Sequence, residues 1–284
     1  MPGEFLARRR SATWRNRSGG RFAFRKARRV LGIAGCASWY AEAGQWVYPC
    51  AMTRTILIAG ASGLVGSEFL GKALDDVRVD RVVALVRRST GLKHPKLVEW
   101  TSGEGDLLTG LREERVDAVV CALGTTIRTV GGDRQKFIHV DRDLVLGLGQ
   151  WAKRLSVPVF SVVSAIGADP RSRVFYSRVK GEMEAGLRAI AISRTVILQP
   201  SIITGPRKEV RSGERVGIAM MTALAPLMWG GLSIYRPMRS DLLAAALLES
   251  SLSERLPSGV HVLRYHAIRA LAGGRSPATS SSNP

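Results

Sequence analysis

Short apolar runs alternate with helical patterns along the central part of this chain. The apolar runs are rich in Val, Ile and Leu without polar alternation, which is typical of strands buried on both faces of a parallel sheet. We predict strands at Thr55–Ala59, Arg81–Val86, Ala118–Leu123, Pro158–Ser164 and Thr195–Gln199, and a late strand in Gly259–Tyr265. Helices are expected at Leu64–Leu74, Asp133–Leu155, Ser177–Ile190 and Asp241–Ser253, the last capped by Ser240 or Asp241. This alternation predicts an α/β fold with a doubly wound parallel sheet.

The two ends of the chain differ from this pattern. Residues 1–51 carry ten Lys and Arg against two Glu, a net charge of +8. We interpret residues 1–52 as a disordered basic extension, or as upstream sequence with Met52 as the true start. An export signal at Ala27–Cys36 is the alternative, but its apolar core is shorter than the roughly 7–15 residues that such signals need. Residues 273–284 have the composition of a disordered tail.

One uncharged stretch, Val216–Tyr235, is about as long as a membrane span. Pro226 and the pair Gly230–Gly231 interrupt it, and small residues dilute its hydrophobicity. We therefore favour a buried or lid-forming helix followed by a loop over a membrane span, and expect no stable membrane insertion.

Charge and cysteine content exclude several kinds of protein. Of the formal charge of +19, the part of the chain after the leader keeps +11, without a long run of like charge. No stacking aromatic residues interleave its basic residues, so we expect no nucleic-acid binding. Three cysteines (Cys36, Cys50 and Cys121) without CxxC spacing argue against a metal site and a disulfide framework. Cys121 is expected to be a small buried residue, and a reducing, cytoplasmic setting fits best.

A glycine triplet follows the first predicted strand and opens the first predicted helix. This spacing allows a tight turn, close backbone approach to a pyrophosphate and a helix N-terminus directed at its charge. We therefore predict an NAD(P)-binding Rossmann domain at residues 53–272. A plain strand-to-helix turn is the alternative. The cradle would consist of Gly60, Ser62, Gly63, Leu64, Val65 and Gly66.

Residues at the ends of two other strands bear on the cofactor. Arg87 and Arg88 stand where a carboxylate would bind the ribose of NAD. Since guanidinium groups instead bind a 2′-phosphate, we predict NADP(H) in preference to NAD(H), with two solvated arginines as the alternative. Asp106 would bond the adenine amino group or act as an ordinary turn aspartate. The cofactor backbone should pass the strand end formed by Leu123, Gly124 and Thr125.

The candidate catalytic residues lie in "VVSAIGADPRSRVFYSRVK". Tyr176 and Lys180 are four residues apart and share one helix face, and Ser164 closes the preceding strand. A free tyrosine titrates near pH ~10, and a neighbouring ammonium group lowers that pKa toward the working range of an acid catalyst. We expect Tyr176 to be the general acid. Lys180 would also hold the nicotinamide ribose, and Ser164 would donate to the substrate oxygen.

Four segments, "LGTT", "VDRDLVL", "YSRVKGEMEA" and "RKEVRSGE", occur in the order found in a known family. The chain resembles an atypical short-chain dehydrogenase/reductase related to the extended, NAD-dependent epimerase/dehydratase-like members, closest to the Tat-interacting oxidoreductase group. The resemblance covers roughly Thr53 to Ala272. It implies an NADPH-binding Rossmann domain with a small C-terminal region that covers the substrate. It also implies a triad of Ser164, Tyr176 and Lys180, with Pro200 and Ser201 beside the nicotinamide.

Two positions depart from that family pattern. His139 stands near where many reductases have an asparagine that sustains a proton-relay water, with Asp141 two residues on. A proton relay or an ordinary core or surface histidine are the alternatives. Gln199 stands where an arginine is frequent, which would change how the sheet edge is tied down.

Two further arginines, Arg207 and Arg211, either bind an anionic substrate or anchor a loop.

These observations predict an NADPH-dependent oxidoreductase that acts on a small carbonyl substrate, as a monomer or homodimer. A non-catalytic NADP(H)-binding regulatory module is the alternative, because the fold by itself does not decide function.

Overall fold

The computed structural model describes residues 54–205 and 235–274, together with the backbone of four short strands before them. The chain divides into two units, Met1–Met52 and Thr53–Pro284. In the first unit the strands pair as two antiparallel hairpins, β1 (Thr13–Arg15) with β2 (Arg21–Ala23) and β3 (Ala27–Leu31) with β4 (Ala37–Ala41). No strand was predicted from the sequence in this unit. The disorder predicted for residues 1–52 as a whole stays a prediction.

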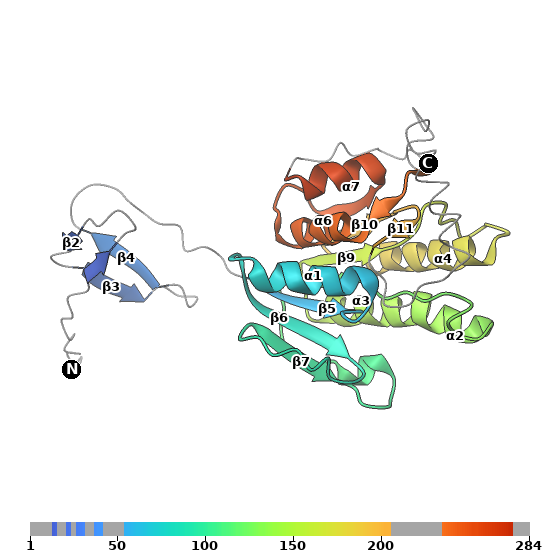
Figure 1. The fold of residues 1–284 in the computed structure, drawn as a ribbon, viewed down its shortest axis with the longest axis horizontal. Helices are drawn as coiled ribbons and strands as arrows, with labels where there is room; N and C mark the ends of the chain where they lie inside the picture. Colours follow the sequence, from blue (N-terminus) through green and yellow to red (C-terminus); the bar gives the residue numbers. More distant parts are fainter. Residues whose placement is uncertain are drawn as a thin grey trace. The chain divides into compact units, whose positions relative to one another are not determined.

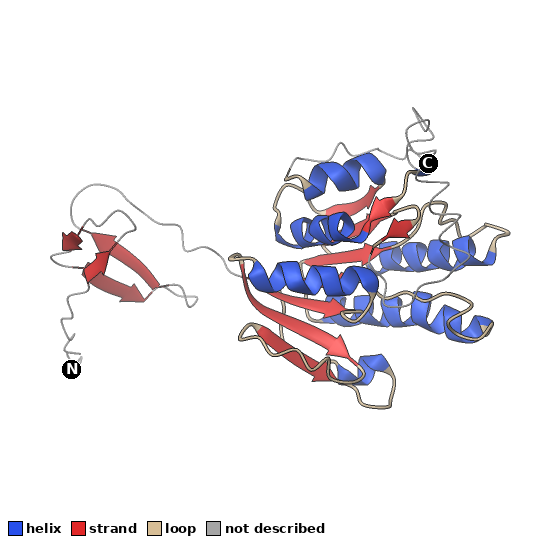
Figure 2. Cartoon of the chain, viewed as in Figure 1, coloured by secondary structure: helices blue, strands red, loops and turns tan. Residues whose placement is uncertain are grey.

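The second unit is built on a seven-stranded sheet with the order β13-β10-β9-β8-β5-β6-β7 (Figures 1 and 2). Every neighbouring pair in it is parallel. The order is that of a Rossmann sheet, in which the winding direction reverses between the first strand of the sheet and the fourth, here β5 and β8. The predicted α/β class is confirmed. The strands are β5 (Arg54–Ala59), β6 (Val79–Val86), β7 (Leu97–Thr101), β8 (Ala118–Cys121), β9 (Val159–Val163), β10 (Arg194–Leu198) and β13 (Gly259–Leu263).

Helices cover both faces of this sheet, which explains the uniformly apolar strands. Alternate residues of β5 enter opposite cores, Ile56 and Ile58 on one side and Leu57 and Ala59 on the other. The first core is closed by α1 (Leu64–Asp75), α6 (Ser240–Leu252) and α7 (Tyr265–Ala272), and the second by α3 (Leu144–Arg154) and α4 (Phe175–Ile190).

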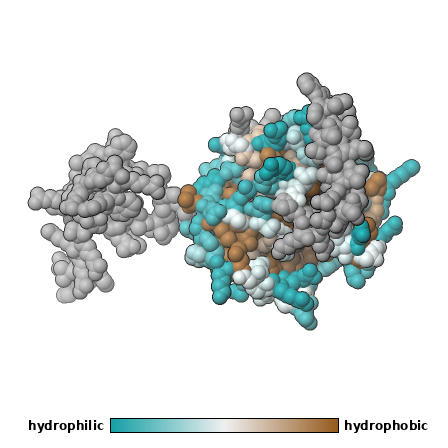
Figure 3. Space-filling model, in the orientation of Figure 1, coloured by the Kyte–Doolittle hydropathy of each residue, from teal (hydrophilic) through white to brown (hydrophobic). Residues whose placement is uncertain are grey.

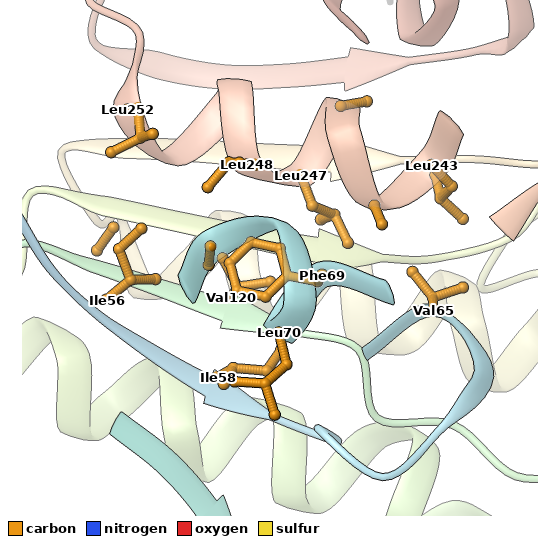
Figure 4. Close-up of a cluster of buried hydrophobic side chains, with 14 of the residues drawn as sticks. Ile56, Ile58, Val65, Phe69, Leu70, Val120, Leu243, Leu247, Leu248 and Leu252 are labelled. Atoms are coloured by element: carbon orange, nitrogen blue, oxygen red, sulfur yellow. The ribbon is translucent and has the colours of Figure 1, made fainter. Parts of the chain in front are cut away.

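Figure 4 shows how α1 is held in the first core. Phe69 of α1 is fully buried between the sheet residues Ile56 and Val120 and the α6 residue Leu247. Complete burial of a side chain of this kind contributes about 1.5–3 kcal/mol. Because α1 begins directly after the glycine loop, this packing also fixes the position of that loop.

The surface of the described part is mixed in character. On the face drawn in Figure 3, hydrophobic areas are small and interspersed with hydrophilic residues. Within residues 54–205 and 235–274, no helix combines the length and the apolar character needed to cross a membrane. Of the uncharged stretch Val216–Tyr235, all but Tyr235 lies outside the described residues.

Several predicted elements need correction. The single helix expected at Asp133–Leu155 is three elements: α2 (Arg134–Ile138), a π turn at His139–Asp143, and α3. The edge strand β7 was missed because Glu99 interrupts its apolar pattern. Helix α6 is not capped by Ser240 or Asp241. Its N-cap is Arg239, and the Asp241 carboxylate pairs with that arginine at 2.8 Å. Also not predicted were α7, the 3₁₀ turn at Leu107–Gly110 and the short pair β11 (Ile203–Thr204) and β12 (Met238–Arg239).

Candidate active site

The glycine loop lies where the winding direction of the sheet reverses. Gly60 follows β5 and has a φ of +92°, which side chains of L-residues rarely tolerate. A Cβ atom there would lie 2.7 Å from the Ala122 carbonyl carbon and 2.9 Å from the Leu123 nitrogen. Glycine therefore allows the carboxyl ends of β5 and β8 to approach each other. Ligands of open α/β sheets bind in the crevice at this point.

The other two glycines close the loop onto the start of α1. The Gly63 amide donates to the Gly60 carbonyl oxygen at 3.0 Å. A Cβ atom on Gly66 would lie only 2.0 Å from that same oxygen. Both observations show a tight turn whose backbone has no room for a side chain at the third glycine.

The amino end of α1 has the properties of a diphosphate site. Gly63 is its N-cap, no side chain caps the first-turn amides, and the first turn holds no acidic residue. Ser62 and Gly63 are exposed, Leu64 is half-buried and Val65 is buried. Free amides at the positive end of a twelve-residue helix fit a pyrophosphate group well. That these residues bind the cofactor stays a prediction.

The arginines expected to bind a 2′-phosphate are exposed after β6. Arg88 has a distant partner in Glu104, at 4.0 Å, and both side chains are more than 80% exposed. The following residues are held more firmly, since Glu99 accepts hydrogen bonds from the Ser89 hydroxyl at 2.5 Å and the Thr90 amide at 2.9 Å. Both guanidinium groups are therefore accessible to a ligand beside a fixed loop.

Asp106 has a local structural role. One carboxylate oxygen accepts from the Leu108 amide at 2.8 Å and so caps the 3₁₀ turn that follows. The other lies 3.0 Å from Nε2 of His139. The turn role that the sequence left open is therefore present, and a contact with adenine stays a prediction.

Asp141 is the residue that faces the candidate catalytic lysine. Its Oδ1 lies 2.8 Å from Nζ of Lys180, and the two residues are only 1% and 3% exposed. Its Oδ2 accepts the Thr125 amide at 2.8 Å, in the loop after β8. His139 was expected near this position, but it is half-exposed and pairs with Asp106. The reason is that residues two apart face opposite sides of a helical segment, and Asp141 shares the buried side with Phe137, four residues before it.

Tyr176 and Lys180 lie on one face of α4, as predicted from their spacing. Tyr176 is 42% exposed, and its partial burial raises its pKa. The Lys180 charge lowers this pKa, as expected, but partial burial and the Asp141 charge outweigh it, so the pKa lies above its ordinary value. For Lys180 itself, burial lowers the pKa, but Asp141 and Tyr176 outweigh burial and raise it.

Ser164 is connected to α4 one turn beyond Lys180. Its hydroxyl donates to Oε1 of the buried Glu184 at 2.5 Å, although the sequence led us to expect that this proton is offered to a substrate. The same oxygen accepts Nε2 of Gln199 at 2.8 Å, and Arg264 donates to Oε1 of Gln199 at 3.2 Å. Gln199 therefore ties α4 to the segment after β13. Glu184 was missed from the sequence, although it continues the four-residue spacing of Tyr176 and Lys180.

The remaining predicted residues have mixed outcomes. Pro200 is buried directly after β10, and the Ser201 hydroxyl donates to the Arg236 carbonyl oxygen. Gly124 is exposed and Leu123 half-buried at the crevice. Arg207 and Arg211 lie outside the described residues.

Cys121 is fully buried at the end of β8, which confirms its predicted role as a small core residue. Burial raises the pKa of its thiol to about 11, so it is uncharged at neutral pH. Cys36 and Cys50 lie outside the described residues. Within the described ranges, no three His, Cys, Asp or Glu residues gather where they could hold a metal ion.

Comparison with known proteins identifies relatives across this unit. The chain is 32% identical over 175 residues to the mitochondrial protein FMP52 of Eremothecium gossypii, covering 62% of this chain and 77% of the relative. It is 28% identical over 225 residues to mitochondrial fmp52 of Emericella nidulans, covering 74% and 94%. Protein HTATIP2 of Rattus norvegicus is 31% identical over 166 residues, covering 57% and 67%. No family model matches the chain.

The fungal relatives correct one expectation. They are named as mitochondrial proteins, and this finding overturns the predicted cytoplasmic setting. Cysteine usage reports only on the redox state of a compartment, and it therefore did not distinguish a mitochondrial from a cytoplasmic setting.

Solved structures share the fold at low identity. MoeE5 in complex with UDP-glucose and NAD has a TM-score of 0.55 and 17% identity, covering 78% of this chain and 83% of that one. The Bordetella bronchiseptica enzyme WbmG in complex with NAD has a TM-score of 0.54 and 15% identity, covering 84% and 85%. At this identity the likeness shows a shared Rossmann fold. Together with the relatives above, the sheet order and the glycine loop establish that this chain belongs to the atypical short-chain dehydrogenase/reductases, in the group that includes FMP52 and HTATIP2.

Proposed function

We propose that this protein is an NADP(H)-dependent oxidoreductase that reduces a small carbonyl substrate, with Tyr176 as proton donor. One observation carries the proposal. Tyr176 is 42% exposed, while the Lys180 and Asp141 charges that act on it are buried and paired with each other. A reactive phenol open to a ligand and supported by a fixed charge pair is the arrangement that carbonyl reduction requires.

The residues of the chain divide the work between binding and proton transfer. When bound, the nicotinamide cofactor supplies the hydride that the carbonyl carbon receives. Tyr176 holds a proton at Oη, and its transfer to the carbonyl oxygen completes the alcohol. The phenol holds this proton at neutral pH, since its pKa lies above the ordinary value. The Lys180 charge is the influence that lowers this pKa toward the range in which a general acid works best. Lys180 supplies the positive charge beside the phenol, and Ser164 would orient the substrate oxygen after turning away from Glu184.

This function is tested by incubating the protein with NADPH and a library of carbonyl compounds. Loss of the absorbance of reduced nicotinamide measures turnover. Reduction of at least one small carbonyl is expected. A second candidate, a non-catalytic NADP(H)-binding regulatory module, is favoured by the Ser164 proton, which is already given to Glu184. NADPH binding without hydride transfer to any carbonyl in the library would support that candidate and contradict the first.

Removal of the two exposed arginines should discriminate between the cofactors. In the variant Arg87→Ala/Arg88→Ala, we expect NADPH to bind about tenfold more weakly or worse, since each hydrogen bond to a charged group contributes about 1.5–3 kcal/mol. NADH affinity should change little. Titration calorimetry with both nucleotides measures the difference, and Lys93→Ala, which removes an exposed cation from the same loop, is the control. Equal losses for NADPH and NADH would contradict the assignment.

A further inference from the structure

Asp141 connects two parts of the candidate site that lie on different elements. Its carboxylate contacts the Lys180 ammonium group on α4 and the Thr125 amide in the loop after β8, each at 2.8 Å. The residue itself comes from the π turn between α2 and α3. With 1% of its surface exposed, it is shielded from water, which strengthens its action on the neighbouring charges.

The groups around Lys180 leave Asp141 as its counter-charge. Among the described residues, Lys180 interacts with Asp141 from the π turn, Tyr176 from its own helix and Cys121 from β8. The phenol and the thiol are neutral at pH 7 because both have raised pKa values.

Other charges near the π turn are engaged elsewhere. His139 pairs with Asp106, and Arg142 pairs with Asp143 and with Glu182. On α4, Glu184 pairs with Arg188. Asp141 therefore has a specific role toward Lys180 that these neighbours do not share.

We propose that Asp141 is a positioning residue: its buried carboxylate fixes the Lys180 ammonium group and compensates its charge, which would otherwise favour the ionised form of Tyr176. The catalytic meaning of this role rests on the proposed function, in which Tyr176 is the proton donor. An uncharged partner at position 141 would leave the ammonium group uncompensated beside Tyr176. The phenol would then lose its proton at lower pH and serve better as an acceptor, as in alcohol oxidation.

The variant Asp141→Asn tests this without requiring turnover. Asparagine keeps the size of the side chain and an oxygen for the Thr125 amide. We expect Tyr176 to ionise about one pH unit lower than in the wild type, because Asp141 acts on its pKa and a nearby charge typically shifts a pKa by about one to three units. The readout is near-ultraviolet absorbance of the phenolate during an alkaline titration. The same titration with Tyr176→Phe in each background isolates the signal of this tyrosine.

Asp143→Asn is the matched control. It removes an equal charge two residues further along the same π turn, from a side chain that is 46% exposed and pairs with Arg142. We expect no shift of the Tyr176 titration in this variant. A shift of equal size in both variants, or none in Asp141→Asn, would overturn the proposal.

Loss of one partner from a buried ion pair can prevent folding. Should Asp141→Asn fail to fold, Lys180→Met/Asp141→Asn carries the test, because it removes both buried charges together and leaves neither unpaired. If Asp141 compensates Lys180, Tyr176 should ionise in this variant close to its wild-type pH. A shift of about one pH unit or more in either direction would refute the compensation.

The dependence of turnover on pH separates this inference from the proposed function. In Asp141→Asn the alkaline loss of carbonyl reduction should move to lower pH together with the phenol titration. A shifted titration in a protein that reduces no carbonyl would overturn the reductase function and support the charge role of Asp141. Normal carbonyl reduction with an unshifted Tyr176 titration would support the reductase function and overturn the charge role of Asp141.

Discussion

Replacing Tyr176 with phenylalanine should lower turnover about 10²–10⁴-fold and leave NADPH binding nearly unchanged, because a positioned general acid contributes a factor of that size. Phenylalanine keeps the ring, which packs at 5.9 Å between centroids against buried Phe137. Only the hydroxyl is lost. Steady-state kinetics with the best carbonyl found, together with NADPH calorimetry, measures both quantities.

Tyr265→Phe provides a control for this experiment. Tyr265 begins α7 and packs against His266 and Arg269, so its hydroxyl has no part in the proposed chemistry. This variant should turn over at the wild-type rate. If Tyr176→Phe did so too, the assignment of Tyr176 as proton donor would be wrong even if NADPH still bound.

Alanine at two glycines of the same helix should change stability in opposite directions. In Gly66→Ala the new Cβ would lie 2.0 Å from the Gly60 carbonyl oxygen, so backbone has to move. Forced overpacking typically costs 1–3 kcal/mol, and we expect about 3 kcal/mol here because the obstacle is main chain. At Gly71 a Cβ would meet nothing within 4 Å. Gly71→Ala should therefore stabilise the protein by roughly 0.5–1 kcal/mol, the helix penalty of glycine.

Urea unfolding of both variants measures these changes in the free energy of unfolding. Because the Gly66 clash lies in the loop that shapes the crevice, Gly66→Ala should also weaken NADPH binding, whereas Gly71→Ala should not. Similar stabilities for the two variants would show that the loop can relax around a side chain, contrary to its observed geometry.

The sequence by itself determined six of the seven sheet strands, the glycine loop and the shared helix face of Tyr176 and Lys180. Each of these depends on neighbouring residues: uniformly apolar strands, glycines next to a strand end, and a four-residue spacing on one helix. Such features follow from local periodicity and backbone sterics, which consecutive residues specify.

Only the tertiary structure decided which distant groups meet. Asp141 rather than His139 meets Lys180 because the side of the helical segment that carries Asp141 and Phe137 is the one packed into the protein, and local spacing does not say which side that is. The bond from Ser164 to Glu184 depends in the same way on how β9 lies against α4. Buried polar groups take whichever partner the packing brings within reach, because leaving them unpaired is costly. These contacts between elements decide the charge of the site, and they became visible only with the chain folded.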